Sequence, residues 1–180
     1  MSKDIERESA IAEAAAAEPL RDQATQLIEA LQTSHAEAVS DVIQAFGEIT
    51  VVVRREYLVE LCNYLKTTPE FRFDMLADIC GVDRGPEEDP RFEVNYHLFS
   101  TKKFHRLRLK VLVGEEDARL PTVTGVWRTA NWHERETFDM FGVRFEGHPD
   151  LRRILLPDDW QGHALRKDFP LRGYEPYSLS

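Results

Sequence analysis

The sequence predicts an α+β fold: a two-layer domain with a mixed, largely antiparallel sheet packed on helices, plus an extended irregular C-terminal docking tail. Apolar and polar residues alternate through RFEVNYHLFSTKKFHRLRLKVLVG, which is typical of strands with one buried face. The β-branched run in EITVVVRRE leads directly into an amphipathic pattern at EYLVELCNYLKTTP, and this strand-to-helix step favours mixed construction. Because neither period continues beyond Gly142, we expect a core domain over residues 23–142 and an extended segment over residues 143–180.

The N-terminal part of the chain contains two kinds of sequence. Residues 1–22 are rich in Ala and acidic residues, and we expect a mobile N-terminal arm there. From about Arg21 to Phe46 the apolar residues follow helical spacing, which predicts one or two helices. Gly47 favours termination of the second helix, because glycine adopts the left-handed conformation of a helix cap. The apolar positions that carry this prediction are Leu27, Leu31, Val39, Ile43 and Phe46.

The middle of the chain is predicted as strand, helix and strand. The run from Ile49 to Val53 is β-branched and predicts a strand. In the helix that follows, the apolar residues between Leu58 and Leu65 share one face, and Pro69 lies beyond its end. FRFDMLADIC then predicts a strand, and the Gly- and Pro-containing stretch GVDRGPEEDP predicts an acidic loop after it.

The alternating stretch predicts a β-hairpin that turns near residues 100–103. A turn at that place would pair Tyr96 with Leu107 across the two strands. The same register would set Glu93 opposite Lys110, which is a favourable cross-strand charge pair. The polar face of such a hairpin is covered by solvent or by a partner. It also explains the basic cluster KKFHRLRLK as an outer face, in place of a nucleic-acid site.

The C-terminal third combines a helical pattern with an irregular tail. Residues from about Thr122 to Phe141 are predicted helical, with a break near Ala130-Asn131. The tail after Gly142 holds several prolines and glycines but also many leucines, aromatics and arginines, which disordered tails lack. A segment that cannot build its own core is predicted to lie along another protein surface.

Composition excludes several classes of protein. The net charge of −9 and the pI of about 5.2 argue against a nucleic-acid-binding protein. No run of apolar residues reaches the length of a membrane span, and the N-terminus resembles neither a signal peptide nor a transit peptide. Cys62 and Cys80 form no metal-binding pair, so we expect buried free thiols in a reducing compartment. The chain is predicted to be soluble and cytoplasmic.

The stretch NWHERETFDMFGVRFEGHP concentrates the groups that could carry chemistry. It misses the helical zinc motif H-E-x-x-H by one residue, because Thr137 stands four residues after His133. A stand-alone metal-dependent hydrolase using His133, Glu134 and Glu136 is therefore one hypothesis. Paired carboxylates for acid/base catalysis are another, although no nucleophile motif, phosphate loop or dinucleotide fingerprint accompanies them. Docking of a partner accounts for more of the charged and aromatic residues.

The spacing of these residues resembles a family signature. Glu134-Arg135-Glu136, Asp139, Met140-Phe141, His148, Arg152 and Ile154-Leu155 follow the pattern of the thirty-kilodalton subunit family of respiratory complex I, the family of the C subunit of bacterial NADH–quinone oxidoreductase. The adjoining block GVRFEGHPDLRRILLPDDWQGHALRKDFPL is similar to the C-terminal block of that family. The resemblance is strongest over about residues 125–172 and departs at Ala164, where proline is expected after Gly-His.

The resemblance implies a peripheral-arm subunit that binds no cofactor itself. It would support electron transfer from NADH, via FMN and iron–sulfur clusters, to quinone in a proton-pumping complex, by docking on the forty-nine-kilodalton subunit (the D subunit of the complex). The expected location is the cytoplasmic face of the bacterial inner membrane, with membrane association only through the complex. An equivalent subunit of a related membrane-bound hydrogenase or dehydrogenase is the alternative. We expect no catalytic, cofactor or metal residues, and a partner interface at Glu134, Arg135, Glu136, Asp139, His148, Arg152, Arg153, Trp160, His163, Arg166 and Lys167. Substitutions in the Glu134–Glu136 triplet are expected to impair assembly more than stability.

Overall fold

The computed structural model describes residues 25–174 of the 180-residue chain. The predicted N-terminal arm, residues 1–22, therefore lies outside the described residues. A helical segment at residues 25–34 comes first. The elements that follow are β1 (Val39–Ala45), β2 (Glu48–Val53), the 3-10 helix η1 (Arg55–Tyr57), α2 (Leu58–Thr67), β3 (Met75–Asp83), β4 (Phe92–Phe99), β5 (Arg106–Val113), β6 (Arg119–Pro121), α3 (Ala130–Phe141) and β7 (Arg144–Glu146).

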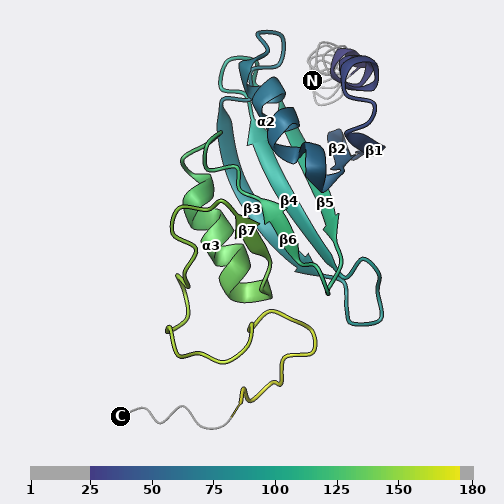
Figure 1. Ribbon diagram of the computed structural model, residues 1–180. Helices are drawn as coiled ribbons and strands as arrows, with labels where there is room; N and C mark the ends of the chain where they lie inside the picture. Colours follow the sequence, from purple (N-terminus) through teal and green to yellow (C-terminus); the bar gives the residue numbers. More distant parts are fainter. Residues whose placement is uncertain (1–24, 175–180) are drawn as a thin grey trace, which may run out of the picture.

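The larger sheet has the strand order β1-β2-β5-β4-β3. β2 and β5 are parallel, and the three other neighbouring pairs are antiparallel. α2 lies across one face of this sheet, and α3 packs along β3 at its edge (Figure 1). A second, two-stranded sheet pairs β6 with β7 in parallel. The predicted α+β fold with a mixed, largely antiparallel sheet is confirmed.

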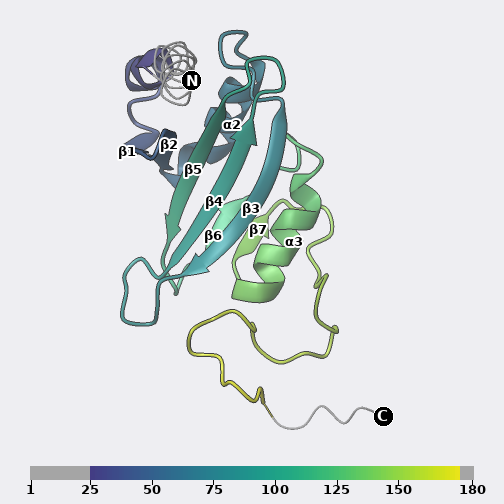
Figure 2. The ribbon, with the colours of Figure 1, turned by 180° about the vertical axis from the view of Figure 1, so that it is seen from behind.

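The core lies between the sheet and α2. Period-2 alternation places every second residue of β4 and β5 on this buried face, and one side of α2 packs against them. Leu27 and Leu31 of the N-terminal helix join the same cluster. Figure 2 shows that no described helix covers the opposite face of the sheet. The strands contribute Phe92, Val94, Tyr96, Leu98, Leu107, Leu109, Val111 and Val113, and α2 contributes Leu58, Leu61, Cys62 and Leu65.

The prediction of a second helix up to Phe46 is wrong, because β1 occupies residues 39–45. Val39 and Ile43 have helical spacing, but β1 is the edge strand of the sheet and is mostly exposed, so it carries no alternating pattern. Phe46 and Gly47 both have positive φ angles, 54° and 78°. Two such residues form the tight turn that joins twisted antiparallel strands. Gly47 therefore closes a hairpin and does not cap a helix.

The hairpin of β4 and β5 has the predicted faces but a different register. Tyr96 pairs with Leu109 instead of Leu107, a shift of two residues that leaves the same side chains buried. Lys110 stands opposite Asn95, yet its Nζ still reaches a Glu93 carboxylate oxygen at 3.0 Å on the diagonal. The loop spans residues 100–105 and is longer than the predicted turn, which causes the shift.

The prediction of helix from Thr122 is wrong for its first part. β6 ends at Pro121, turns follow, and α3 begins only at Ala130. Val123 and Trp127 are buried in these turns, and the indole Nε1 of Trp127 donates to the carbonyl oxygen of Phe73 at 3.2 Å. The helical spacing of these apolar residues thus comes from turns that pack against the core.

The described part of the C-terminal segment beyond β7 contains turns and bends but neither helix nor strand up to residue 174. From β7 it runs down past α3, turns below the helix toward the lower end of the sheet, and its described part ends below them (Figure 1). Both cysteines are free: Cys62 is buried as expected, whereas Cys80 is only half-buried, with its Sγ 3.6 Å from His97 Nε2. Burial raises the pKa of both thiols.

Candidate functional site

The candidate site is the C-terminal end of α3, where the tail folds back on the helix. Gly142 caps the helix in the left-handed conformation, with φ 80°, and its N–H donates to the carbonyl oxygen of Phe138 at 2.8 Å. A Cβ at Gly142 would fall 2.6 Å from His163 Nε2, so the close approach of the tail requires glycine. His163 Nδ1 lies 2.9 Å from the carbonyl oxygen of Asp139. Because a carbonyl only accepts, Nδ1 carries the proton, and burial lowers the pKa of His163, which keeps the ring neutral.

The remaining carbonyls of the last helical turn are also satisfied by the tail. The N–H of Leu165 donates to the carbonyl oxygen of Met140 at 3.1 Å. Arg166 Nε donates to the carbonyl oxygen of Phe141 at 2.7 Å. A helix leaves these carbonyls without internal partners and carries a partial negative charge there, which a guanidinium complements. The tail thus acts as the C-terminal cap of α3.

The carboxylate of Asp139 holds the start of the tail. It is fully buried, and Oδ2 accepts the backbone N–H groups of Ile154, Leu155 and Leu156 at 3.0, 2.8 and 2.9 Å. Arg153 donates to Oδ1 at 2.6 Å. Burial alone would raise the pKa of Asp139, but these N–H groups and the guanidinium together hold it below its usual range. An ionised carboxylate therefore fixes a turn of backbone 15 to 17 residues away.

Arginine side chains close the tail into a loop. Arg153 donates to the carbonyl oxygens of Trp160 and Gly162 at 3.0 and 2.9 Å, in addition to its bonds with Asp139. From α3, Arg135 donates to the carbonyl oxygens of Arg152 and Arg153 at 3.1 and 2.9 Å. Each guanidinium reaches several acceptors at once because it presents five N–H donors in a rigid planar fork. Backbone carbonyls of the tail accept from both guanidinium groups, and Asp139 also accepts from Arg153.

Glu134 points into the domain on another side of α3. Its side chain is 0% exposed, Oε1 accepts the N–H of Val123 at 2.7 Å, and Oε2 accepts the Thr122 hydroxyl at 2.5 Å. Burial raises the pKa of Glu134 to about 7, although both hydrogen bonds oppose the shift. The Glu134 bonds anchor the turns between β6 and α3.

His148 is the histidine nearest to this carboxyl group, with Nε2 4.0 Å from Oε2 of Glu134. Nδ1 of His148 accepts the N–H of Asp150 at 3.0 Å, and Nε2 lies 3.0 Å from the carbonyl oxygen of Asn131. This arrangement places the proton on Nε2. His148 thus links the start of α3 to the start of the tail.

A second network, around Arg91, holds the end of the tail and was missed by the sequence analysis. Arg91 is only 2% exposed and binds Asp83 through two hydrogen bonds, of 3.0 and 2.8 Å. It also donates to both carboxylate oxygens of Asp168, at 3.0 and 2.7 Å, and to Glu115. The Arg91 guanidinium lowers the pKa of Asp83 to about 2. The backbone N–H of Lys167 adds a bond of 2.7 Å to Asp83.

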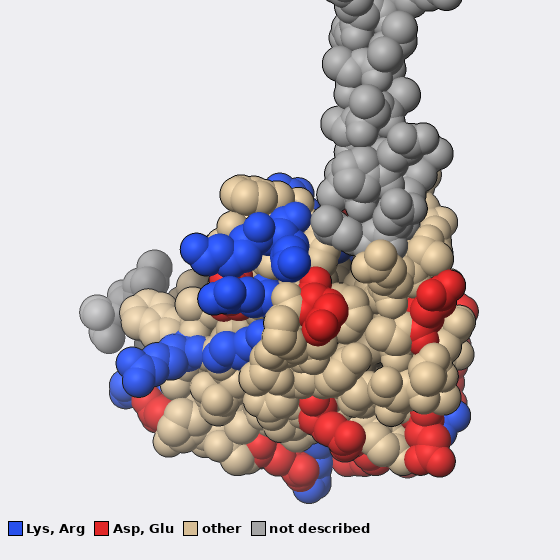
Figure 3. Space-filling model, turned by 90° about the horizontal axis from the view of Figure 1, so that it is seen from above, with Lys and Arg blue, Asp and Glu red and all other residues tan. Residues whose placement is uncertain are grey.

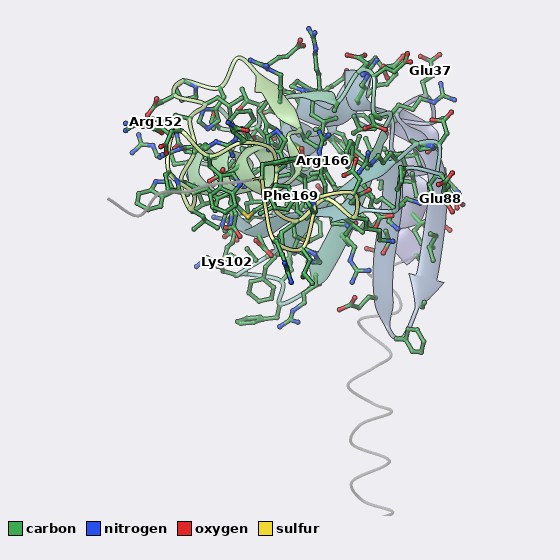
Figure 4. All side chains as sticks on the ribbon, turned by 90° about the horizontal axis from the view of Figure 1, so that it is seen from below. Glu37, Glu88, Lys102, Arg152, Arg166 and Phe169 are labelled. Atoms are coloured by element: carbon green, nitrogen blue, oxygen red, sulfur yellow. The ribbon has the colours of Figure 1, made fainter. Side chains whose placement is uncertain are left out.

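The predicted interface residues therefore fall into two groups. The first group mainly contacts the chain itself, and it consists of Glu134, Arg135, Asp139, His148, Arg153, His163 and Arg166. The members of the second group are exposed. Figure 4, which looks onto the tail, shows Arg152 of this second group toward the edge of the molecule and Arg166 of the first group near its centre. The second group consists of Glu136, Arg152 and Lys167. Trp160 stacks on Phe169 with ring centroids 6.2 Å apart. Contact of any of these residues with a partner stays a prediction.

The residues of the hydrolase hypothesis do not converge on one point. His133 Nδ1 lies 3.2 Å from a carboxylate oxygen of Asp78 on β3. Glu134 is turned away to Thr122, and Glu136 is exposed. Within residues 25–174 no group of three His, Cys, Asp or Glu side chains is placed to hold a metal ion. Across the same range, no helix combines the length and apolarity required to span a membrane.

The fold and the site together define a small α+β domain that binds its own long C-terminal segment at the end of a helix. The family model described as "Respiratory-chain NADH dehydrogenase, 30 Kd subunit" matches residues 51–175. The chain belongs to this family, and the resemblance found in the sequence is confirmed.

Similar proteins agree with this assignment. The second C subunit of NADH-quinone oxidoreductase from Rhizobium meliloti is 56% identical over 138 residues, which cover 77% of this chain and 75% of that protein. The corresponding C subunit from Roseiflexus is 48% identical over 154 residues, covering 86% and 87%. The solved trypsin-resistant fragment of Nqo5 is 40% identical with a TM-score of 0.60, covering 69% of this chain and 98% of that chain. An archaeal membrane-bound sulfane sulfur reductase structure, 23% identical with a TM-score of 0.67 over 82% and 85%, shares the fold.

Proposed function

We propose that this chain is a peripheral-arm subunit of a proton-pumping NADH–quinone oxidoreductase and that it docks on the forty-nine-kilodalton subunit through its C-terminal segment. The family, and the identity of about half with proteins named as C subunits of NADH-quinone oxidoreductase, support this complex over a related hydrogenase or dehydrogenase. The complex would carry electrons from NADH through FMN and iron–sulfur clusters to quinone. This chain would contribute rigidity and assembly at the cytoplasmic face of the inner membrane, without a cofactor of its own.

The arrangement of the tail carries the proposal. The backbone N–H groups of residues 154–156 and the carboxylate of Asp168 are directed inward, where Asp139 and Arg91 hold them. Three leucines of the tail point outward: Leu155 is 60% exposed, Leu165 56% and Leu171 103%. Many hydrogen bonds fix this segment in place, and it presents leucines to solvent. These are the features of a preformed binding surface.

A co-purification experiment tests this proposal. The double variant Leu155→Ser, Leu165→Ser removes two apolar anchors without touching the network that holds the tail. Burying a leucine contributes about 1.5–3 kcal/mol, so the loss of two should weaken binding by about a hundred-fold or more. A tagged variant purified from native membranes should then lose the forty-nine-kilodalton subunit.

Leu112→Ser is the matched control, because Leu112 is also an exposed leucine, at 38%, on the open face of the sheet. The control should retain the forty-nine-kilodalton subunit, and both variants should unfold at the urea concentration of the native chain. Normal recovery of that subunit with the double variant would reject docking through the tail.

A further inference from the structure

The end of the sheet opposite the tail carries an unusual loop between β4 and β5. The N–H of Ser100 donates to the carbonyl oxygen of His105 at 3.0 Å, and the N–H of Phe104 donates to the carbonyl oxygen of Ser100 at 2.8 Å. The Ser100 hydroxyl accepts the N–H of Lys103 at 3.2 Å. The loop therefore closes on itself through its own backbone and one side chain.

The segment of residues 71–74, just before β3, holds this loop. Asp74 accepts the N–H and the hydroxyl of Thr101 at 2.8 and 2.7 Å. The ring of His105 stacks on Phe73, with centroids 4.5 Å apart and planes 17° apart. His105 Nε2 also lies 2.9 Å from the carbonyl oxygen of Phe71. A loop fixed by this many bonds presents its exposed side chains in one defined arrangement.

Backbone strain gathers at this same end of the sheet. Among residues 25–174, Phe46, Arg72 and Phe104 are the non-glycine residues with positive φ, at 54°, 48° and 55°. They lie in the three loops that precede β2, β3 and β5, which all begin at this end. This conformation is unfavourable for a residue with a side chain, and such outliers concentrate at functional sites.

The strained residues project apolar groups into solvent. Phe46 is 105% exposed and Phe104 is 75% exposed. Met75, the first residue of β3, is 47% exposed at the same end of the sheet. These two phenylalanines have strained backbones and largely exposed side chains, so they contribute nothing to the core. Their positions favour burial against another molecule.

Four cations lie at the same end of the sheet as these apolar groups. Arg72, Lys102, Lys103 and Arg106 are exposed, and none of them forms an ion pair among the described residues. Figure 3 looks onto this end of the molecule and shows Lys and Arg side chains gathered on one side of it. In a chain with a net charge of −9, a group of unpaired cations selects an acidic ligand.

A hollow on the open sheet face continues this surface. Its volume is about 430 Å³, and Met75, Ala77 and Phe99 give it an apolar lining. Arg106, Arg108 and Glu48 supply the charged part of the lining, and Arg108 is already paired with Glu48 at 2.6 Å. The hollow can receive an apolar side chain while Arg106 remains free to bind a carboxylate.

We propose that Phe46, Phe104, the four cations and this hollow form a second docking surface, distinct from the tail, for an acidic polypeptide segment that carries apolar side chains. The apolar hollow and the Glu48 carboxylate in its lining disfavour a phosphate backbone, which binds continuous positive charge. A flat lipid surface would leave the hollow empty. A peptide with alternating carboxylates and apolar groups satisfies the cations, the phenylalanines and the hollow together.

Photo-crosslinking within the purified native complex tests the proposal. Phe104→p-benzoyl-phenylalanine places the reactive group on the surface, and Val82→p-benzoyl-phenylalanine is the control at an exposed apolar position toward the other end of β3. Mass spectrometry should find Phe104 linked to an acidic peptide of another chain. The added pair Lys102→Glu, Lys103→Glu should lower this yield at least ten-fold, as should about 0.5 M salt applied before illumination.

Several results would overturn the proposal. These are no cross-link at Phe104, a link only to lipid or nucleic acid, a link to a neutral or basic peptide, or a yield that the charge reversal does not change. Retention of the forty-nine-kilodalton subunit in the Lys102→Glu, Lys103→Glu variant separates this surface from the tail. Loss of that subunit in the same variant would show that the two surfaces are not independent and would also refute the proposal.

Discussion

The substitution Asp139→Asn should release the start of the tail from α3 while the sheet domain stays folded. One carboxylate oxygen accepts three backbone N–H groups, and the other accepts Arg153. Asparagine has one oxygen and one NH2 group of nearly the same size. If its oxygen faces the backbone, its NH2 opposes the guanidinium, and if the amide flips, its NH2 opposes three N–H donors. Both orientations set donors against donors.

The structure sets the size of this effect. Breaking a buried ion pair by removing one partner costs about 3–5 kcal/mol. The tail keeps its bonds to the end of α3 and to Arg91, so we expect the lower value, about 3 kcal/mol, for the turn at residues 154–156. Since about 1.4 kcal/mol is ten-fold, local opening should become roughly a hundred-fold more frequent.

Native-state hydrogen exchange measures this opening directly, at the amides of residues 154–156 that Asp139 binds. These amides should lose about a hundred-fold in protection, while the amides of β4 change little. Asp150→Asn is the control, because Asp150 lies in the same tail in an exposed pair with Arg152. Unchanged protection of residues 154–156, or an equal loss in β4, would refute the account of Asp139 as the local anchor.

Two further predictions concern the buried charges. Arg91→Met should lower the free energy of unfolding by about 3–5 kcal/mol, because it leaves the Asp83 carboxylate buried without its cation. Urea unfolding measures this change. The control Arg119→Met, at an exposed arginine, should lower the free energy of unfolding by under about 0.5 kcal/mol. A variant as stable as the native chain would contradict the network. The pKa of Glu134 is about 7 in the folded chain against 4.5 when unperturbed, so its contribution to stability is full below about pH 4.5 and is lost, by about 3 kcal/mol, as the pH rises to about 7. In urea unfolding between about pH 5 and about pH 8, the Glu134→Gln variant should not show this loss of stability. The control Glu136→Gln, at an exposed carboxyl, should still show it. Equal dependence of stability on pH in the two variants would count against a titrating Glu134.

The hairpin shows what alternation can and cannot predict. It identified both strands and their buried residues, because side chains in a strand alternate with period two. A shift of two residues preserves that alternation, so Tyr96 could be paired with Leu107 as well as with its true partner Leu109. The register depends on how the loop closes, and the bonds between Ser100 and His105 that close it have no simple sequence signal.

Edge position explains the failure at β1. Val39 and Ile43 have the spacing of one helical face. β1 is an edge strand with most side chains exposed, so its residues do not need to alternate between apolar and polar. The positive φ of Phe46 was equally invisible, because phenylalanine rarely adopts it. Tertiary pairing with β2 decided the structure of this segment.

The candidate site was located by its residues but not by its bonds. Asp139 was recognised as part of a signature and Arg153 as an expected interface residue. The groups that Asp139 binds, however, include three backbone N–H groups, which every residue except proline possesses. Sequence therefore gives no indication of which backbone groups a carboxylate will meet. Arg91 and Asp168 lie 77 positions apart and entirely outside the signature. Only the folded chain brings them together.

The signature triplet then divides by direction along α3. Consecutive helical residues point about 100° apart, so Glu134 enters the domain, Arg135 reaches the tail, and Glu136 is left exposed. The three residues should therefore affect assembly by different routes. Replacing Glu134 or Arg135 would disturb assembly by misplacing the tail, and no change in a partner could restore it. Glu136 is the acid of the triplet that a partner can reach, so a compensating charge on the partner should rescue a substitution at this position alone.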